Sequence, residues 1–365
     1  MQKSVARPLI MDYLKSLTDD TGIFQHTKFG IPDRSHGYTS DDNARALIAA
    51  VMLYKSSKDQ GSLALVRTYL AFIYHAQNDD GGFRNFMGYN REFLENTGSE
   101  DCLGRCMWAL GYMLAEPAIP QNLRNTCRYM INQALPRMRE LSSPRAIAYG
   151  LIGFTAMLES GEALSYSLPF SNKEDVDPGF LPRAEMEAII EELALRLHMQ
   201  YESNKGTGWH WFENSITYGN AMLPWAMLEA SALSHTEMFR QTAKESLDFL
   251  AAATFSKEGF YKPIGSHGWL ERGGAAALFD EQPIEACEML LACMSAYKRF
   301  GNHTYLVYAS SCYDWFHGRN SLSVSLIDEQ TGACYDGIHA TGLNLNQGSE
   351  NIVSYCMAHM VMQNE

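Results

Sequence analysis

The stretch DDNARALIAAVMLYK (41–55), followed by GSLALVRTYLAFIYHAQ (61–77), decides the fold of this 365-residue chain. After its polar opening, the first segment is apolar on all sides at helical spacing, which is typical of a helix that is buried all round. The second segment is apolar on one face and polar on the other, which is typical of a helix with one face in solvent. The pair therefore predicts an inner helix followed by an outer helix.

The same alternation runs along the whole chain. Segments that are apolar on all sides lie at 41–55, 99–115, 144–160, 217–233, 281–299 and 348–362. Segments with one polar face lie at 5–18, 61–77, 120–140, 182–201, 236–254 and 302–317. Six inner and six outer helices in strict alternation close into a ring, and no Pro/Gly/Ser-rich linker divides them. We therefore expect an all-α fold, an (α/α)6 barrel or six-hairpin toroid, in one domain over residues 1–365.

A second repeat lies between the outer and inner segments. A polar residue, a glycine and usually an aromatic residue recur in DDTGIF (19–24), DDGGF (79–83), GTGWHWF (206–212), KEGFY (257–261) and QTGACY (330–335). Glycine permits a tight turn, and the aromatic residue begins a short extended run. We expect small β-hairpins at these positions, all at the mouth of the toroid where the inner helices begin.

Charge, hydropathy and cysteine spacing exclude several kinds of partner. The formal net charge is −13 and the basic residues are scattered, which disfavours binding to nucleic acid or to an anionic membrane. No stretch approaches the roughly 18 apolar residues of a membrane span, and no C-x-x-C or H-E-x-x-H motif is present. We expect a cytoplasmic protein without a metal, a cofactor, a nucleic-acid partner or a membrane partner.

Acidic clusters open four of the inner segments. They consist of Asp41, Asp42, Glu100, Asp101, Asp280, Glu281 and Glu350. Because all inner helices begin at one mouth, we expect these carboxyl groups around a single cavity. Each cluster also has a simpler explanation, since acids in a first turn stabilise the helix dipole by about 0.3–1 kcal/mol and Ser40, Ser99 and Ser349 are suitable N-caps. Four clusters in register nevertheless favour a bound ligand, because their mutual repulsion must be offset.

Glu213 stands apart from these clusters, in the run GWHWFEN (208–214). Its aromatic neighbours favour the protonated carboxyl group, which suits a general acid. Carboxylates at helix N-termini have the opposite bias, so Asp42 and Asp101 are the candidates for an ionised general base. An exposed hairpin glutamate without a chemical role is the simpler alternative for Glu213.

Side chains suited to sugar recognition accompany the acids. Flat rings match the C–H face of a sugar, and amides, cations and carboxylates match its hydroxyl groups. Besides the three catalytic candidates, the candidate substrate-binding residues are His36, Tyr38, Asp41, Arg45, Glu100, Arg105, Trp209, His210, Trp211, Tyr218, Asn220, Asp280, Gln282, Asn346, Gln347 and Glu350. Arg45 and Arg105 follow Asp41 and Asp101 by four residues, a spacing that allows an ion pair within each helix.

Five motifs carry a resemblance to known proteins. They are SHGYTSDDNARAL (35–47), GSEDCLGR (98–105), WHWFEN (209–214), FDEQPIEA (279–286) and NLNQGSEN (344–351). Together with the alternating helices, they resemble the six-hairpin glycosidase superfamily, which includes unsaturated glucuronyl hydrolases and several α-mannan-degrading enzymes. More narrowly, they are similar to a bacterial branch often found beside or fused to glycosyltransferases. The resemblance implies a carbohydrate-active role and transfers no catalytic assignment.

Three functions follow from this combination. The first is an inverting glycoside hydrolase acting on a neutral oligosaccharide, such as a mannoside, with Glu213 as acid and Asp42 or Asp101 as base. The second is a sugar epimerase or polysaccharide lyase that abstracts a carbon-bound proton with His or Tyr, for which His36 or His210 must face the cleft. The third is a non-catalytic glycan-binding partner of a glycosyltransferase.

Overall fold

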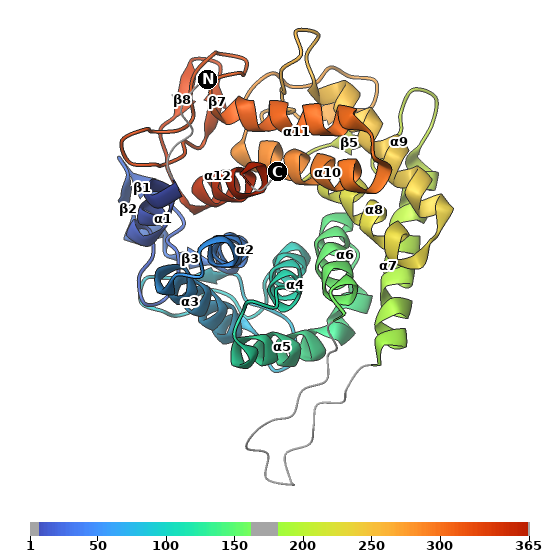
Figure 1. Cartoon of the computed structure of the whole chain (residues 1–365). Coiled ribbons are helices and arrows are strands. Elements are labelled where there is room, and N and C mark those ends of the chain that lie inside the picture. Colours follow the sequence, from blue (N-terminus) through green and yellow to red (C-terminus); the bar gives the residue numbers. More distant parts are fainter. Residues whose placement is uncertain (1–6, 162–181, 364–365) are drawn as a thin grey trace.

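The computed structural model describes residues 7–161 and 182–363, which form a ring of two concentric helical layers (Figure 1). The inner layer consists of α2 (Ser40–Ser57), α4 (Glu100–Leu114), α6 (Pro144–Glu159), α8 (Met222–Ser234), α10 (Pro283–Phe300) and α12 (Ser349–Met362). The outer layer consists of α1 (Arg7–Ser16), α3 (Gln60–Ala76), α5 (Gln121–Glu140), α7 (Arg183–Asn204), α9 (Glu237–Thr254) and α11 (His303–Phe316). The predicted (α/α)6 fold is confirmed.

The inner layer closes on itself. Each inner helix packs against the next one along the chain, and α12 packs against α2. In α10 every residue from Pro283 to Ala296 is buried, whereas the outer helix α7 buries one face only. The two hydropathy patterns therefore correspond to the two layers, because only a helix surrounded by others can be apolar on all sides.

Glycines allow α4 and α6 to approach very closely. A Cβ atom on Gly111 would lie 2.3 Å from the carbonyl oxygen of Gly153, and one on Gly153 would lie 2.5 Å from that of Met107. No side chain fits at either separation, so the two helices pack backbone against backbone. This contact brings α4, which carries Asp101, close to α6, which Ser143 caps.

Short hairpins crowd the mouth at which the inner helices begin. Antiparallel pairs form between β1 (Thr27–Lys28) and β2 (Ile31–Pro32), β3 (Tyr38–Thr39) and β4 (Phe86–Met87), β5 (Ser215–Ile216) and β6 (Leu270–Glu271), and β7 (Gly337–His339) and β8 (Gly342–Asn344). The five predicted turns are each closed by an antiparallel bridge, namely Thr18–Ile23, Gln77–Phe83, Gly206–Trp209, Phe255–Tyr261 and Ile327–Cys334. The hairpin prediction is therefore confirmed.

Two inner helices begin later than the sequence pattern predicts. Helix α8 begins at Met222, after Gly219 has taken a left-handed backbone conformation with φ of 58°. Helix α10 begins at Pro283, so Asp280 and Glu281 lie in the preceding loop and not in the first helical turn. The dipole argument for that acidic cluster was wrong, because the first-turn acid of α10 is Glu285.

The N-caps also differ from the expected serines at two of three helices. The side chain of Thr39 caps α2 by accepting from the Asp42 N–H, while Ser99 caps α4 as predicted. Gly348 occupies the cap position of α12, and the Ser349 hydroxyl donates to Gln25 O instead. Ser40 and Ser349 therefore hold neighbouring loops, which shape the walls of the mouth.

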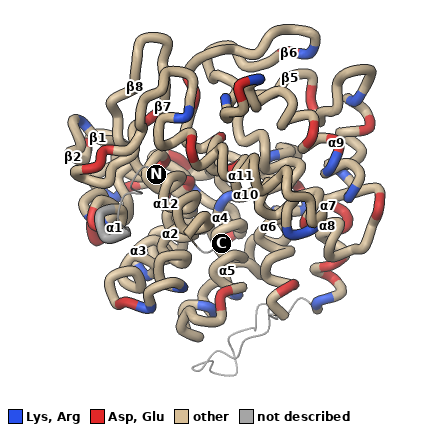
Figure 2. The backbone as a smooth tube through the Cα atoms, turned by 45° about the horizontal axis from the view of Figure 1, so that its top comes forward, with Lys and Arg blue, Asp and Glu red and all other residues tan. Residues whose placement is uncertain are grey.

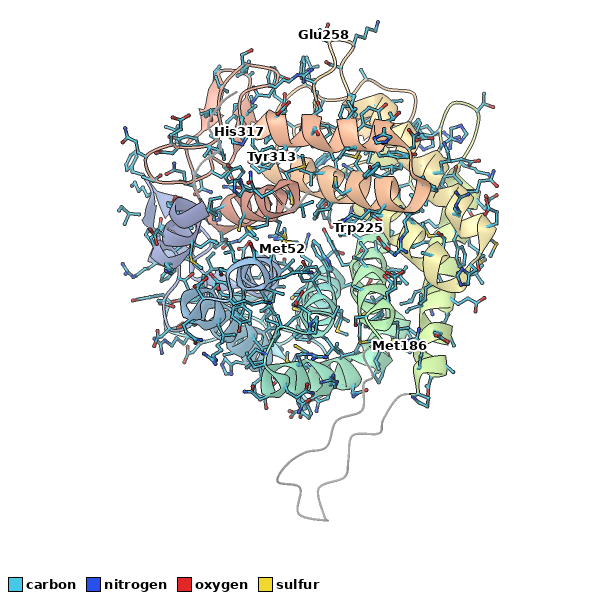
Figure 3. All side chains as sticks on the ribbon, in the orientation of Figure 1. Met52, Met186, Trp225, Glu258, Tyr313 and His317 are labelled. Carbon is cyan, nitrogen blue, oxygen red and sulfur yellow. The ribbon has the colours of Figure 1, made fainter. Side chains whose placement is uncertain are left out.

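The far end of the ring has a different character. A hollow of about 490 Å³ lies toward the C-terminal ends of several inner helices and is lined mostly by apolar side chains, including Met52 and Trp225, which Figure 3 labels beside the central opening. All eight cysteines are buried, and none is joined to another by a disulfide. Within residues 7–161 and 182–363, no helix is both long and apolar enough to cross a bilayer.

Candidate active site

A recess of about 170 Å³ opens between the N-termini of α2 and α12; we call it the α2–α12 recess. Its lining residues are Gln25, His26, Thr39, Asp41, Asp42, Arg45, Asn85, Phe86, Asp336, Asn346, Gly348, Glu350 and Asn351. The volume is below the roughly 300–1,000 Å³ of sites for drug-sized ligands, so the recess accommodates about one sugar ring. Four of its lining side chains are carboxyl groups and one is a guanidinium group.

Arg45 joins two of these carboxyl groups across neighbouring helices. Its Nη2 atom lies 2.9 Å from Asp42 Oδ1 and 2.9 Å from Glu350 Oε2. The two oxygens are therefore at most twice 2.9 Å apart. The side chains of Arg45 and Asp42 are 4% and 5% exposed, whereas that of Glu350 is 39% exposed and faces the recess.

The environment of Glu350 favours its neutral form. Burial raises the pKa of Glu350 above its usual value, although the Arg45 guanidinium acts in the opposite direction. The pKa of Asp336, in the same recess, is also raised by burial. The recess therefore holds two carboxyl groups whose pKa is raised by burial, Glu350 and Asp336, and one of them shares the Arg45 guanidinium with Asp42.

Arg105 makes the equivalent link from α4 to α2. Its Nη1 atom lies 3.2 Å from Asp41 Oδ1, and the Asn85 amide donates to Asp41 Oδ2 at 3.1 Å. Neither predicted i, i+4 pair, Asp41–Arg45 or Asp101–Arg105, is formed. Arg45 pairs with Asp42 within α2 and with Glu350 of α12, and Arg105 pairs with Asp41 of the neighbouring helix. In Figure 2 acidic and basic segments adjoin inside the ring, beside the labels of α12 and α4.

Two buried glutamates form the floor of the mouth. Tyr149 Oη donates to Glu288 Oε1 at 3.1 Å and accepts from Arg105 Nη2 at 3.5 Å. Burial, followed by the charge of Glu285, raises the pKa of Glu288 to about 8. Glu285 accepts from the Gly219 N–H at 2.6 Å, and burial raises its pKa as well. Polar groups from α2, α4, α6, α10 and α12 thus converge on the axis of the ring.

A second recess of about 460 Å³ lies between the N-termini of α4 and α6; we call it the α4–α6 recess. It is lined by Ser99, Glu100, Asp101, Arg105, Ser142, Ser143 and Tyr218. Asp101 accepts from Ser143 Oγ at 2.6 Å and from the Tyr218 hydroxyl. Glu100 accepts from the backbone N–H groups of Ser142 at 2.7 Å and Ser143 at 2.5 Å, and these bonds lower its pKa against the effect of burial.

Glu213 lies beyond Tyr218 in contact with a cation. Its Oε2 atom is 2.9 Å from Arg145 Nη1, and its side chain is 27% exposed. The guanidinium of Arg145 also covers the Tyr218 ring, with Cζ 4.7 Å from the ring centroid. The argument that placed Glu213 in apolar surroundings was wrong, because α6 supplies Arg145, whose guanidinium forms an ion pair with it.

Three aromatic candidates are not exposed rings of a cleft. Trp211 and Tyr38 are fully buried, and Trp209 is 5% exposed with its indole N–H bonded to Glu213 O at 2.8 Å. Tyr38 donates its hydroxyl to Asp19 Oδ2 at 2.7 Å. The prediction that these rings present flat faces to a ligand was wrong, because Tyr38 packs against Phe24 and Phe72, and Trp209 and Trp211 belong to the hydrophobic core. Tyr218, by contrast, is 39% exposed and lines the α4–α6 recess.

The histidine candidates divide between two places. His210 packs against Phe249 of the outer helix α9, with ring centroids 6.1 Å apart, so it does not face the axis of the ring. His36 lies 4.7 Å from His26, measured between ring centroids, and His26 lines the α2–α12 recess. The requirement that His210 face the cleft is therefore not met, whereas a histidine pair adjoins the recess.

The amide candidates and Asp280 lie near the mouth in supporting positions. Asn346 lines the α2–α12 recess and accepts from the Thr27 N–H at 3.1 Å. Asn220 donates to Glu285 at 3.0 Å, and Asp280 lies 2.6 Å from His339 Nδ1. Gln347 is buried, and Gln282 is the N-cap residue of α10 without a capping hydrogen bond from its side chain. None of these five residues lines the α4–α6 recess.

Several polar residues of the mouth were missed from the sequence: Arg145, Tyr149, Glu285, Glu288, Asp336 and His26. A signal was present for two pairs. Arg145 and Tyr149 are four residues apart and Glu285 and Glu288 are three apart, so each pair lies on one face of an otherwise apolar helix. A charged residue inside an all-round apolar helix is buried only where it has a partner, which indicates a polar centre.

Comparisons with known proteins agree with this architecture. No family model matches the sequence, and a search of curated proteins finds no match. Solved structures match over nearly the whole chain. A cellobiose 2-epimerase from Bacillus thermoamylovorans superposes with a TM-score of 0.70 at 11% identity, covering 96% of this chain and 95% of that one. A D-mannose isomerase superposes with a TM-score of 0.69 at 12% identity, covering 98% of this chain and 96% of that one. A GH76 alpha-mannanase from Bacteroides thetaiotaomicron superposes with a TM-score of 0.64 at 13% identity, covering 98% of this chain and 96% of that one.

Fold and site together define the class of the protein. It is an (α/α)6 toroid of the six-hairpin type, with two adjoining carboxyl-rich recesses where its inner helices begin. At identities of 11–13% the likeness to solved structures establishes the fold. Within residues 7–161 and 182–363, no group of three or more His, Cys, Asp or Glu residues is arranged to hold a metal ion.

Proposed function

We propose that this chain is a glycoside hydrolase that acts on a neutral oligosaccharide, with the α2–α12 recess as its catalytic site. One observation carries the proposal: a single recess holds Glu350, whose pKa is raised by burial although it shares Arg45 with Asp42, and Asp41, which is paired with Arg105. Glycoside hydrolysis requires one carboxyl group that donates a proton and a second carboxyl group beside it.

Glu350 is the general acid in this proposal. It is the most open of these three carboxyl groups, and its raised pKa lets it hold a proton for the leaving oxygen. As the bond from the anomeric carbon to that oxygen breaks, the Glu350 proton passes to the oxygen. Water supplies the hydroxyl group of the new anomeric centre, and an ionised carboxylate takes its other proton.

Asp41 is the preferred ionised partner. Its side chain is 19% exposed against 5% for Asp42, and it is held between Arg105 and Asn85. Asp42 lies at most twice 2.9 Å from Glu350, which is less than the roughly 6.5–9.5 Å between carboxyl groups in inverting enzymes. An inverting reaction with Glu350 therefore needs Asp41 or Asp101 as its base, and a pairing with Asp42 would give retention.

The charge of the mouth supports a neutral substrate. The two recesses together are lined by six carboxyl groups and two guanidinium groups. The carboxylate of a uronate would be repelled by this excess of acidic groups, whereas the hydroxyl groups of a neutral sugar can donate hydrogen bonds to them. The mannoside specificity expected from the sequence stays a proposal, for which the mannanase among the similar structures is support at the level of fold.

A hydrolysis screen tests the function directly. Purified protein would be incubated with manno-, gluco- and galacto-oligosaccharides, and products would be followed by chromatography and by NMR of the first anomer formed. We expect Glu350→Gln and Asp41→Asn each to lower kcat by at least about a hundredfold. Glu213→Gln should lower kcat by a smaller factor. If Glu213→Gln alone abolishes turnover, the general acid is Glu213 and the assignment of Glu350 is refuted.

One observation favours a sugar epimerase or isomerase as the second candidate. His26 lines the α2–α12 recess beside His36, so a proton acceptor for carbon-bound hydrogen is present. Incubation of mannose, glucose and cellobiose in D2O tests it, because proton abstraction at C2 exchanges that hydrogen with solvent. Deuterium incorporation without hydrolysis, abolished in His26→Asn, would replace the hydrolase proposal. Tight glycan binding without either reaction would support a binding partner of a glycosyltransferase.

A further inference from the structure

We infer that the α4–α6 recess is a second sugar subsite, so that the substrate spans at least two uncharged pyranose rings, one in each recess. This inference rests on the proposed function, since it takes the α2–α12 recess as the place where the bond is cleaved. It assigns Tyr218 as the platform on which the second ring stacks.

Tyr218 is held rigidly before any ligand binds. Its hydroxyl donates to Asp101, and the Arg145 guanidinium lies against the ring, 4.7 Å from Cζ to the centroid. Arg145 is itself held by Glu213 at 2.9 Å and by Thr217 Oγ1 at 2.7 Å. Arg145 does not line the recess, whereas Tyr218 does and is 39% exposed. A fixed aromatic ring with an open part suits the C–H face of a sugar, because little conformational entropy is lost on binding.

The two recesses adjoin across one ion pair. Arg105 lines the α4–α6 recess, and its Nη1 atom lies 3.2 Å from Asp41 Oδ1, which belongs to the α2–α12 recess. A ligand that fills both recesses must pass over this pair. The bond between its two rings therefore lies beside the carboxylate proposed as the ionised partner of Glu350.

The second subsite selects weakly among neutral sugars. Glu100 is engaged by the N–H groups of Ser142 and Ser143, and Asp101 by Ser143 and Tyr218. These bonds occupy part of the acceptor capacity of both carboxylates, more fully in Glu100 than in Asp101, and the two charges repel an acidic sugar. Recognition there depends mainly on stacking, in a space of about 460 Å³ against about 170 Å³ in the first recess. We therefore expect strict selection in the α2–α12 recess and tolerance in the α4–α6 recess.

Calorimetric titration tests the subsite independently of turnover. Mannose, α-1,6-mannobiose, glucose and cellobiose would be titrated into the Glu350→Gln protein, alone and combined with Tyr218→Ala or Tyr218→Phe. For at least one sugar pair we expect the disaccharide to bind more tightly than the monosaccharide. Tyr218→Ala should weaken the disaccharide about tenfold and leave the monosaccharide unchanged, while Tyr218→Phe, which keeps the ring, should stay within about threefold of the parent.

The outcomes separate this inference from the proposed function. If Tyr218→Ala weakens both sugars equally, or if no disaccharide binds better than its monosaccharide, or if no sugar binds, the second subsite is refuted. If the subsite pattern appears but wild-type protein cleaves none of the disaccharides, the subsite stands and the hydrolase proposal fails. Thermal melting of each variant shows whether the fold is retained, and Tyr218→Phe carries the comparison if the alanine variant is unstable.

Discussion

Replacement of Glu288 by glutamine should make the protein less sensitive to alkaline pH. Glu288 is 2% exposed, accepts from Tyr149 at 3.1 Å, and has its pKa raised to about 8 by burial and by the charge of Glu285. In the unfolded chain the same carboxyl group titrates near 4.5. Between these values the folded protein binds a proton that the unfolded chain releases, so stability falls as pH rises.

The size of the effect follows from this difference. A pKa difference of one between the folded and unfolded states corresponds to about 1.36 kcal/mol. The free energy of unfolding of the wild-type protein should therefore fall by about 2–4 kcal/mol between pH 5 and pH 8 through the titration of Glu288. Glutamine keeps the acceptor for Tyr149 and carries no charge. The free energy of unfolding of Glu288→Gln should therefore exceed that of wild type increasingly as pH rises, with the smallest difference near pH 5.

Urea unfolding at pH 5, 6, 7 and 8 and constant ionic strength measures this directly. The matched control is Glu191→Gln, which makes the same substitution on the exposed face of α7. A pH-independent difference for Glu288→Gln would refute the reasoning. It would mean that Arg105 and Arg45, which oppose the rise in pKa, keep Glu288 ionised throughout.

Three further predictions concern the mouth and the ring. Arg45→Met should lower the free energy of unfolding by about 3–5 kcal/mol, because Asp42 stays buried without its cation. Lys244→Met, which removes an exposed ion pair with Asp248, should lower the free energy of unfolding by at most about 1 kcal/mol. If urea titration shows equal losses for Arg45→Met and Lys244→Met, the argument from burial is contradicted. With Glu350 as acid, kcat/KM should decline as pH rises through a pKa above 4.5, and a profile without this limb would exclude that role. Gly111→Ala should lower the melting temperature although alanine favours helices by about 1 kcal/mol, whereas Gly61→Ala, which meets only side-chain atoms, should be neutral or stabilising.

The ring itself could be predicted from the sequence because its determinants are local. All-round apolarity in 41–55 and one-sided apolarity in 61–77 assign each helix to a layer without reference to any other. Strict alternation then leaves a closed toroid as the arrangement that buries every inner helix. The turn glycines likewise act within a few residues, and the five predicted hairpins are bridged as expected.

The composition of the candidate site was only partly predictable. That acids gather at one mouth follows from helix direction, and Asp41, Asp42 and Glu350 do line one recess. Which cation each acid contacts depends on lateral neighbours in the ring, so Arg45 reaches Glu350 and Arg105 reaches Asp41 across helices.

Tertiary structure also decided which rings and acids face the ligand space. Trp211 and Tyr218 are both aromatic residues of the same hairpin region, yet one is fully buried and the other is 39% exposed. The environment of Glu213 depends on Arg145, and that of Glu288 on Glu285 and on cations from two other helices. Local pattern therefore determined the helices and the end of the ring at which polar groups collect. Only the closing of the ring decided which charges meet, because ion pairs and burial depend on neighbours that are distant in sequence.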